Sequence, residues 1–93
     1  MLATLRRAVA HVRAAPGRAG RLVRVPDADD VVVAGDLHGQ VEAFKVIFQY
    51  AELSKRPRRH LVLQELVHGP HRYPDGSDKS HQLVDLYAAL VCQ

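Results

Sequence analysis

The sequence of 93 residues contains a single cysteine, no tryptophan and no long apolar run. One cysteine, Cys92, cannot form a disulfide within the chain, so a reduced, cytoplasmic setting is the default expectation. No apolar run approaches the ~20 residues needed to cross a bilayer, so no membrane-spanning helix is predicted. A chain of this length makes at most one small domain, which excludes a large enzyme core.

Acidic residues are missing from the first part of the chain. Residues 1–26 contain six arginines and no aspartate or glutamate, whereas residues 27–93 contain 7 basic and 10 acidic side chains. Apolar residues recur in the first part at the spacing of an amphipathic helix, namely Leu2, Leu5, Val9 and Val12. We therefore separate a basic N-terminal helix with an extended lead-in, residues 1–26, from a second part, residues 27–93.

Several interpretations of this basic helix stay open. A plain surface helix is favoured over an organellar transit peptide, because serine is absent from the stretch. A helix lying in a membrane interface is a further alternative. A nucleic-acid partner is not expected, because no aromatic residue is interleaved with the arginines and no binding motif accompanies them.

Strand and helix patterns alternate in the second part. The β-branched run from Val31 to Ala34 lacks polar alternation, which predicts a strand buried on both faces of a parallel sheet. A helical pattern from Gln40 to Leu53, an apolar strand pattern from His60 to Val67 and a helical pattern from Leu83 to Leu90 follow. Strand, helix and strand joined in this way make a βαβ unit with parallel strands, so the predicted fold class is α/β.

Asp36 and His38 follow the first predicted strand directly and stand between two glycines. Side chains at the carboxyl ends of strands are where α/β proteins bind their ligands. A carboxylate oxygen and an imidazole nitrogen together suit manganese, iron or zinc. The plainer alternative is that Asp36 caps the next helix while His38 is an incidental loop residue.

The stretch Val-Ala-Gly-Asp-Leu-His-Gly-Gln at positions 33–40 resembles the Gly-Asp-x-His-Gly motif of calcineurin-like metallophosphoesterases, most closely the serine/threonine phosphoprotein phosphatase branch. The resemblance covers roughly residues 30–93 and implies the N-terminal βαβα portion of that family's sandwich, here preceded by the basic amphipathic helix. It also implies divalent metal ions, with Mn²⁺ expected first and Fe or Zn as alternatives, and Asp36 and His38 as ligands of the first ion. The implied reaction is hydrolysis of a phosphate monoester, with protein phosphoserine or phosphothreonine as a candidate substrate.

The family's second motif aligns with a divergent stretch, Gln-Glu-Leu-Val-His-Gly-Pro at positions 64–70. Glu65 falls on the family's bridging aspartate and is the third expected metal ligand. His68 replaces an aspartate that orients the catalytic histidine and is itself the candidate catalytic residue, although it lacks that negative charge. Gly69 replaces a phosphate-binding arginine, for which Arg72 is the candidate substitute. The alternative for Glu65, His68, His71 and Arg72 is an exposed polar loop without a ligand.

The family's later Gly-Asn-His-Glu segment and its further metal-binding histidines are absent from the sequence. The resemblance therefore predicts an incomplete N-terminal fragment with little or no activity by itself. The alternative function is a non-catalytic pseudo-phosphatase or an interaction module with a vestigial metal loop. The expected partner is a phosphorylated substrate, with no nucleic acid and no membrane span.

Overall fold

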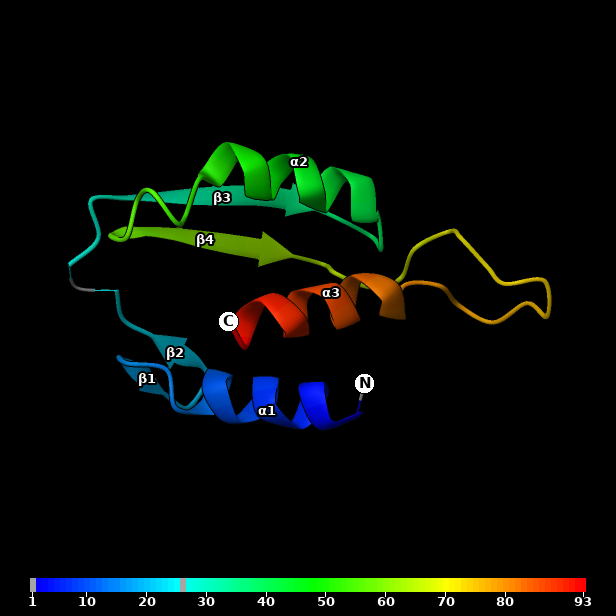
Figure 1. Cartoon of the computed structure of the whole chain (residues 1–93), viewed down its shortest axis with the longest axis horizontal. Coiled ribbons are helices and arrows are strands. Elements are labelled where there is room, and N and C mark those ends of the chain that lie inside the picture. Colours follow the sequence, from blue (N-terminus) through cyan, green and yellow to red (C-terminus); the bar gives the residue numbers. More distant parts are fainter. Residues whose placement is uncertain (1, 26) are drawn as a thin grey trace. The chain divides into compact units, whose positions relative to one another are not determined.

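The computed structural model describes residues 2–25 and 27–93, in which helices and short strands are mixed (Figure 1). The helices of these residues are α1 (Leu2–Arg13), α2 (Val41–Ala51) and α3 (His81–Val91). The strands are β1 (Arg18–Ala19), β2 (Leu22–Val23), β3 (Asp30–Asp36) and β4 (Arg59–Gln64). This mixture confirms the predicted α/β class. No helix among the described residues is long and apolar enough to cross a membrane.

The chain divides into two compact units. One comprises Met1–Asp27 together with Asp85–Gln93, and the other comprises Ala28–Val84. The first unit holds α1, β1 and β2, and the second holds β3, α2, β4 and the long loop that follows. Helix α3 begins in the second unit and ends in the first.

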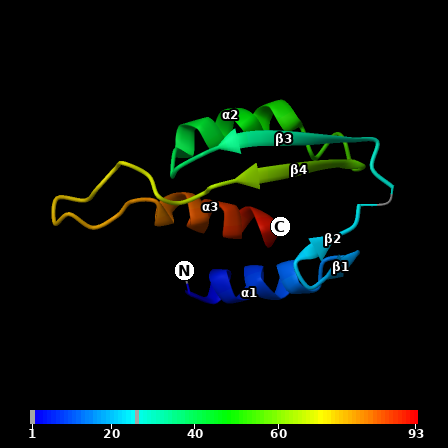
Figure 2. The ribbon, with the colours of Figure 1, turned by 180° about the vertical axis from the view of Figure 1, so that it is seen from behind.

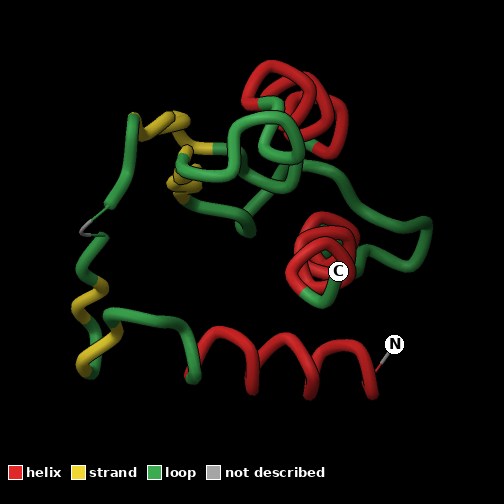
Figure 3. The backbone as a smooth tube through the Cα atoms, turned by 60° about the vertical axis from the view of Figure 1, so that its left-hand side comes forward, coloured by secondary structure: helices red, strands yellow, loops and turns green. Residues whose placement is uncertain are grey.

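A short hairpin occupies part of the predicted extended lead-in. Strands β1 and β2 are antiparallel, with Ala19 opposite Leu22, and are drawn yellow directly after α1 in Figure 3. Gly17 has a φ of 80°, and a Cβ there would lie 2.2 Å from the carbonyl oxygen of Arg24. Only glycine tolerates both the left-handed backbone and this close approach, so Gly17 allows the hairpin to close against the end of the helix.

The second unit is built on the predicted βαβ arrangement. Strands β3 and β4 pair in parallel, with Asp30 opposite Arg59 and Asp36 opposite Gln64. Figures 1 and 2 show their arrowheads pointing the same way, with α2 lying beside them. The pairing is irregular between Val33 and Asp36, where the Gln64 side-chain amide donates to the Ala34 carbonyl at 2.7 Å. The carboxyl ends of both strands therefore lie at one edge.

An arginine fixes the opposite edge of this unit. Arg59 donates from Nε and Nη2 to the two carboxylate oxygens of Asp30, at 2.8 and 2.9 Å, and from Nη1 to the carbonyl of Ala51 at 2.8 Å. One guanidinium thus holds the first residues of both strands and the last turn of α2. The hydrogen bond from Arg59 holds the pKa of the Asp30 carboxyl below its usual value.

The expectation that β3 is buried on both faces is wrong. Val31 and Val33 project on the same side of the strand, and Val33 is 63% exposed. Ala34, on the other side, is buried. The sheet of the second unit has two strands among the described residues and is covered by α2, so the valine side stays open.

Candidate metal-binding site

Backbone hydrogen bonds hold the loop after β3 against the loop after β4. The amide of His38 donates to the carbonyl of Glu65 at 2.7 Å, and the amide of Gly39 donates to the carbonyl of Leu66 at 2.8 Å. The amide of Leu37 lies 3.2 Å from the same Glu65 carbonyl. These bonds continue the strand pairing past its last residues, so the two sequence motifs meet at the carboxyl edge of the parallel strands.

Asp36 and His38 form a close pair at this edge. The Oδ2 atom of Asp36 lies 3.6 Å from the Nε2 atom of His38, and their side chains are 58% and 45% exposed. Two donors held about 2.1 Å from one zinc-like ion at a tetrahedral angle lie about 3.4 Å apart. The observed separation therefore suits two ligands of one ion, and water can reach both atoms.

Glu65 and His68 form a second pair in the neighbouring loop. The Oε1 atom of Glu65 lies 2.6 Å from the Nδ1 atom of His68, and both residues are exposed. An ionised carboxylate can only accept hydrogen bonds, so Nδ1 of His68 donates this one. The other ring nitrogen of His68, Nε2, lies on the opposite side of the ring. Within residues 2–25 and 27–93, no group of three or more histidine, cysteine, aspartate or glutamate side chains is arranged to hold a metal ion. The expected ligands Asp36, His38 and Glu65 thus occur in neighbouring loops but in separate pairs.

Three of the candidate residues have unusual backbone conformations. His38, Glu65 and His68 have φ values of 48°, 46° and 59°. Side-chain-bearing residues rarely adopt this left-handed region, and those that do cluster at binding and catalytic sites. The φ of Glu65 also explains why β4 ends at Gln64, three residues before the predicted end at Val67.

A buried serine, which sequence reasoning missed, fastens both loops. Ser80 is 4% exposed, and its Oγ accepts a hydrogen bond from the amide of Gly69 at 2.7 Å. A Cβ on Gly39 would lie 2.9 Å from this Oγ, and one on Gly69 would lie 2.3 Å from the carbonyl oxygen of His38. Both glycines are therefore required by close packing. In the sequence, the only sign of this packing is that each glycine directly follows a histidine, Gly39 after His38 and Gly69 after His68.

Asp78 holds the backbone of Ser80 in place. The amide of Ser80 donates to Oδ1 of Asp78 at 2.7 Å, and this bond holds the pKa of the Asp78 carboxyl below its usual value. Arg72 lies 3.4 Å from Oδ2 of the same carboxylate. Polar side chains of the loop between β4 and α3 therefore hold this loop in its conformation.

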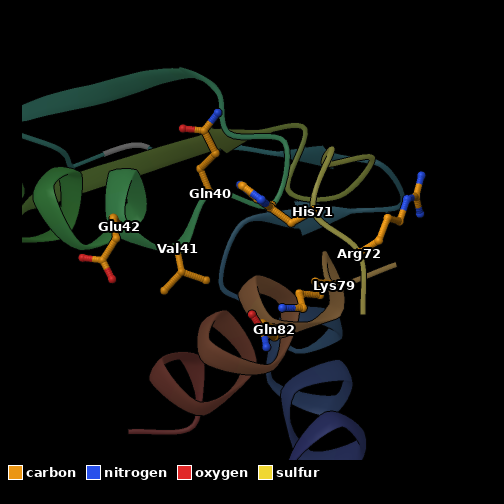
Figure 4. Close-up of a pocket in the computed structure, with 8 residues that line it drawn as sticks. Gln40, Val41, Glu42, His71, Arg72, Lys79 and Gln82 are labelled. Atoms are coloured by element: carbon orange, nitrogen blue, oxygen red, sulfur yellow. The ribbon is translucent and has the colours of Figure 1, made fainter. Parts of the chain in front are cut away.

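A cavity of about 380 Å³ lies between the start of α2 and this loop. Its lining includes three side chains that carry or can gain positive charge, His71, Arg72 and Lys79, and one acid, Glu42. Figure 4 shows His71 next to Gln40, and Arg72 directed away from the other labelled side chains. Arg72, the candidate phosphate ligand, therefore lies at the cavity but faces outward.

The chain has no significant match among models of protein families, curated proteins or solved structures. Its function is therefore inferred from the residues and geometry of the site.

Proposed function

We propose that this chain carries the metal-binding loops of a metal-dependent phosphoesterase acting on phosphate monoesters, with Asp36 and His38 as ligands of a divalent ion. The observation that carries the proposal is the 3.6 Å separation of Asp36 Oδ2 and His38 Nε2 at the carboxyl edge of parallel strands. That edge is where α/β proteins bind ligands, and the donor types suit manganese, iron or zinc. The resemblance of residues 33–40 to the metallophosphoesterase motif supports the same assignment.

Glu65 completes the proposed ligand set. Its carbonyl oxygen already accepts the amide of His38 at 2.7 Å, so its side chain begins next to the Asp36 loop. Rotation about its side-chain bonds exchanges the hydrogen bond to His68 for a position near the first two ligands. When bound, a divalent ion lowers the pKa of water and polarises a phosphoryl oxygen.

His68 supplies the proposed proton transfer. Its ring is 76% exposed, and the contact with Glu65 uses Nδ1. When both ring nitrogens carry a proton, Nε2 would give its proton to the leaving-group oxygen, whether or not Nδ1 keeps its contact with Glu65. Lys79 and His71, which line the cavity beside the Asp36 loop, would attract the negative phosphate group.

The test is a calorimetric titration of Mn²⁺ into the 93-residue chain, with hydrolysis of p-nitrophenyl phosphate measured in the same samples. Asp36→Asn is expected to weaken Mn²⁺ binding at least about tenfold, since loss of even an outer partner of a metal ligand costs that much. Asp29→Asn is the matched control, because Asp29 is exposed, lies before the other end of β3 and pairs with Arg58. Equal binding by the wild type and the Asp36 variant would overturn the ligand assignment.

A second candidate function is a non-catalytic interaction module with a vestigial metal loop. The engagement of Glu65 by His68, at 2.6 Å, favours it, as does the lack of a three-ligand group among the described residues. It predicts no Mn²⁺ binding by the wild type and no effect of Asp36→Asn in the same titration.

A further inference from the structure

The first unit carries an unusual concentration of arginine. Within residues 1–26 no aspartate or glutamate accompanies the six arginines, and all six are exposed. We call them the arginine surface: Arg6, Arg7, Arg13, Arg18, Arg21 and Arg24. The ion pairs found in the described part of the chain involve none of them. These six guanidinium groups therefore stay exposed and positively charged on the first unit.

Large apolar side chains are exposed among these arginines. Leu2 on α1 is 61% exposed, and Leu22 on the hairpin is 57% exposed. Val9, Val23 and Val25 are also exposed in the same unit. In the sequence, Leu22 and Val23 stand directly between Arg21 and Arg24, so exposed apolar residues and arginines are neighbours at this point of the chain.

We propose that the arginine surface, with the leucine and valine side chains between its arginines, docks onto a membrane surface rich in anionic lipids. Arginines attract the negative headgroups, and exposed apolar side chains gain by entering the boundary between headgroups and acyl chains. None of these residues belongs to the candidate metal-binding site, so the proposal does not depend on the proposed phosphoesterase function.

A nucleic acid is the competing polyanion and fits this surface less well. Residues 1–26 contain no phenylalanine, tyrosine or tryptophan, so no ring is available on which a base can stack. The phosphates of a nucleic acid would attract the arginines, but binding would gain no free energy from the exposed side chains of Leu22 and Val23. The apolar component therefore distinguishes the two partners.

The experiment measures sedimentation of the intact chain with vesicles of phosphatidylcholine, alone or with about a quarter of phosphatidylserine. Binding is expected only with phosphatidylserine, and it should fall as salt rises from about 0.1 to about 0.5 M. Arg21→Gln with Arg24→Gln should weaken binding about 30-fold, because each basic residue contributes about fivefold near an anionic surface. The double variant Lys45→Gln with Lys55→Gln removes the same charge from the second unit and should bind as the wild type does.

A second variant tests the apolar component. Leu22→Ser with Val23→Ser alters two exposed side chains, so the fold should persist while vesicle binding weakens several-fold. Equal binding to neutral vesicles, or equal loss in the Lys45 and Lys55 variant, would overturn the proposal. Tight binding of an oligonucleotide that the serine variant leaves unchanged, without vesicle binding, would assign the surface to nucleic acid instead.

Discussion

Adding one methyl group at Gly69 tests whether the two motif loops are packed as closely as the structure has them. A Cβ at this position would lie 2.3 Å from the carbonyl oxygen of His38 and 2.9 Å from Oγ of Ser80. Real Cβ contacts stay above 3.0 Å, so the two backbones must separate by about 0.7 Å. Overpacking of this kind costs about 1–3 kcal/mol, and we expect Gly69→Ala to lower the free energy of unfolding by that amount.

Gly35 offers a matched control on β3. A Cβ there meets nothing within 4 Å, and neither Gly35 nor Gly69 has a φ in the left-handed region. Gly35→Ala therefore carries no steric penalty. It should raise the free energy of unfolding by about 0.4–1 kcal/mol, because alanine lowers the conformational entropy of the unfolded chain. Urea unfolding followed by circular dichroism gives both values under one set of conditions.

The two substitutions are expected to shift stability in opposite directions. If Gly69→Ala is as stable as the wild type, the loops after β3 and β4 do not approach each other as described, and the meeting of the two motifs is refuted. If Gly35→Ala is destabilised as much as Gly69→Ala, the loss comes from glycine replacement in general rather than from the contact with His38.

Two further predictions concern the polar contacts of the second unit. Ser80→Ala leaves the buried amide of Gly69 without its acceptor and should cost about 1–3 kcal/mol in urea unfolding, whereas Ser77→Ala, at an exposed turn, should cost much less. The hydrogen bond from Arg59 holds the pKa of the Asp30 carboxyl below its usual value, so the stabilising contribution of this carboxylate is fully present above that usual value. This contribution is lost as the pH falls through the lower folded-state pKa. Asp30→Asn should therefore flatten the acid side of a plot of unfolding free energy against pH, and an unchanged slope would contradict the role of the Arg59 contact.

Local periodicity was sufficient to predict the main elements of the second unit. The spacing of Phe44, Ile47 and Ala51 marked α2, and the apolar run after Arg59 marked β4. Parallel pairing followed from the order of strand, helix and strand. These features depend on neighbours a few residues apart, which is the range that a single sequence reports directly.

Features that depend on distant residues were not predicted. The bond from Gly69 to Ser80 joins residues eleven apart, and the close approach of Gly69 to His38 joins the loops that follow two different strands. The hairpin at residues 18–23 is too short to show alternation, and its strands have two residues each. The exposure of Val31 and Val33 depends on how many strands accompany β3, which a β-branched run does not reveal.

The two candidate functions require different behaviour of Glu65. Its backbone carbonyl accepts the amide of His38, which brings the two motif loops together whether or not a metal ion binds. Its Oε1 atom lies 2.6 Å from Nδ1 of His68, and within the described residues its carboxylate belongs to no group of three metal-binding side chains. A phosphoesterase requires the carboxylate to exchange partners when an ion enters, whereas an interaction module requires only the backbone bond. The backbone contact is therefore compatible with both candidate functions. Only the phosphoesterase also requires the Glu65 side chain to leave His68 for the metal ion.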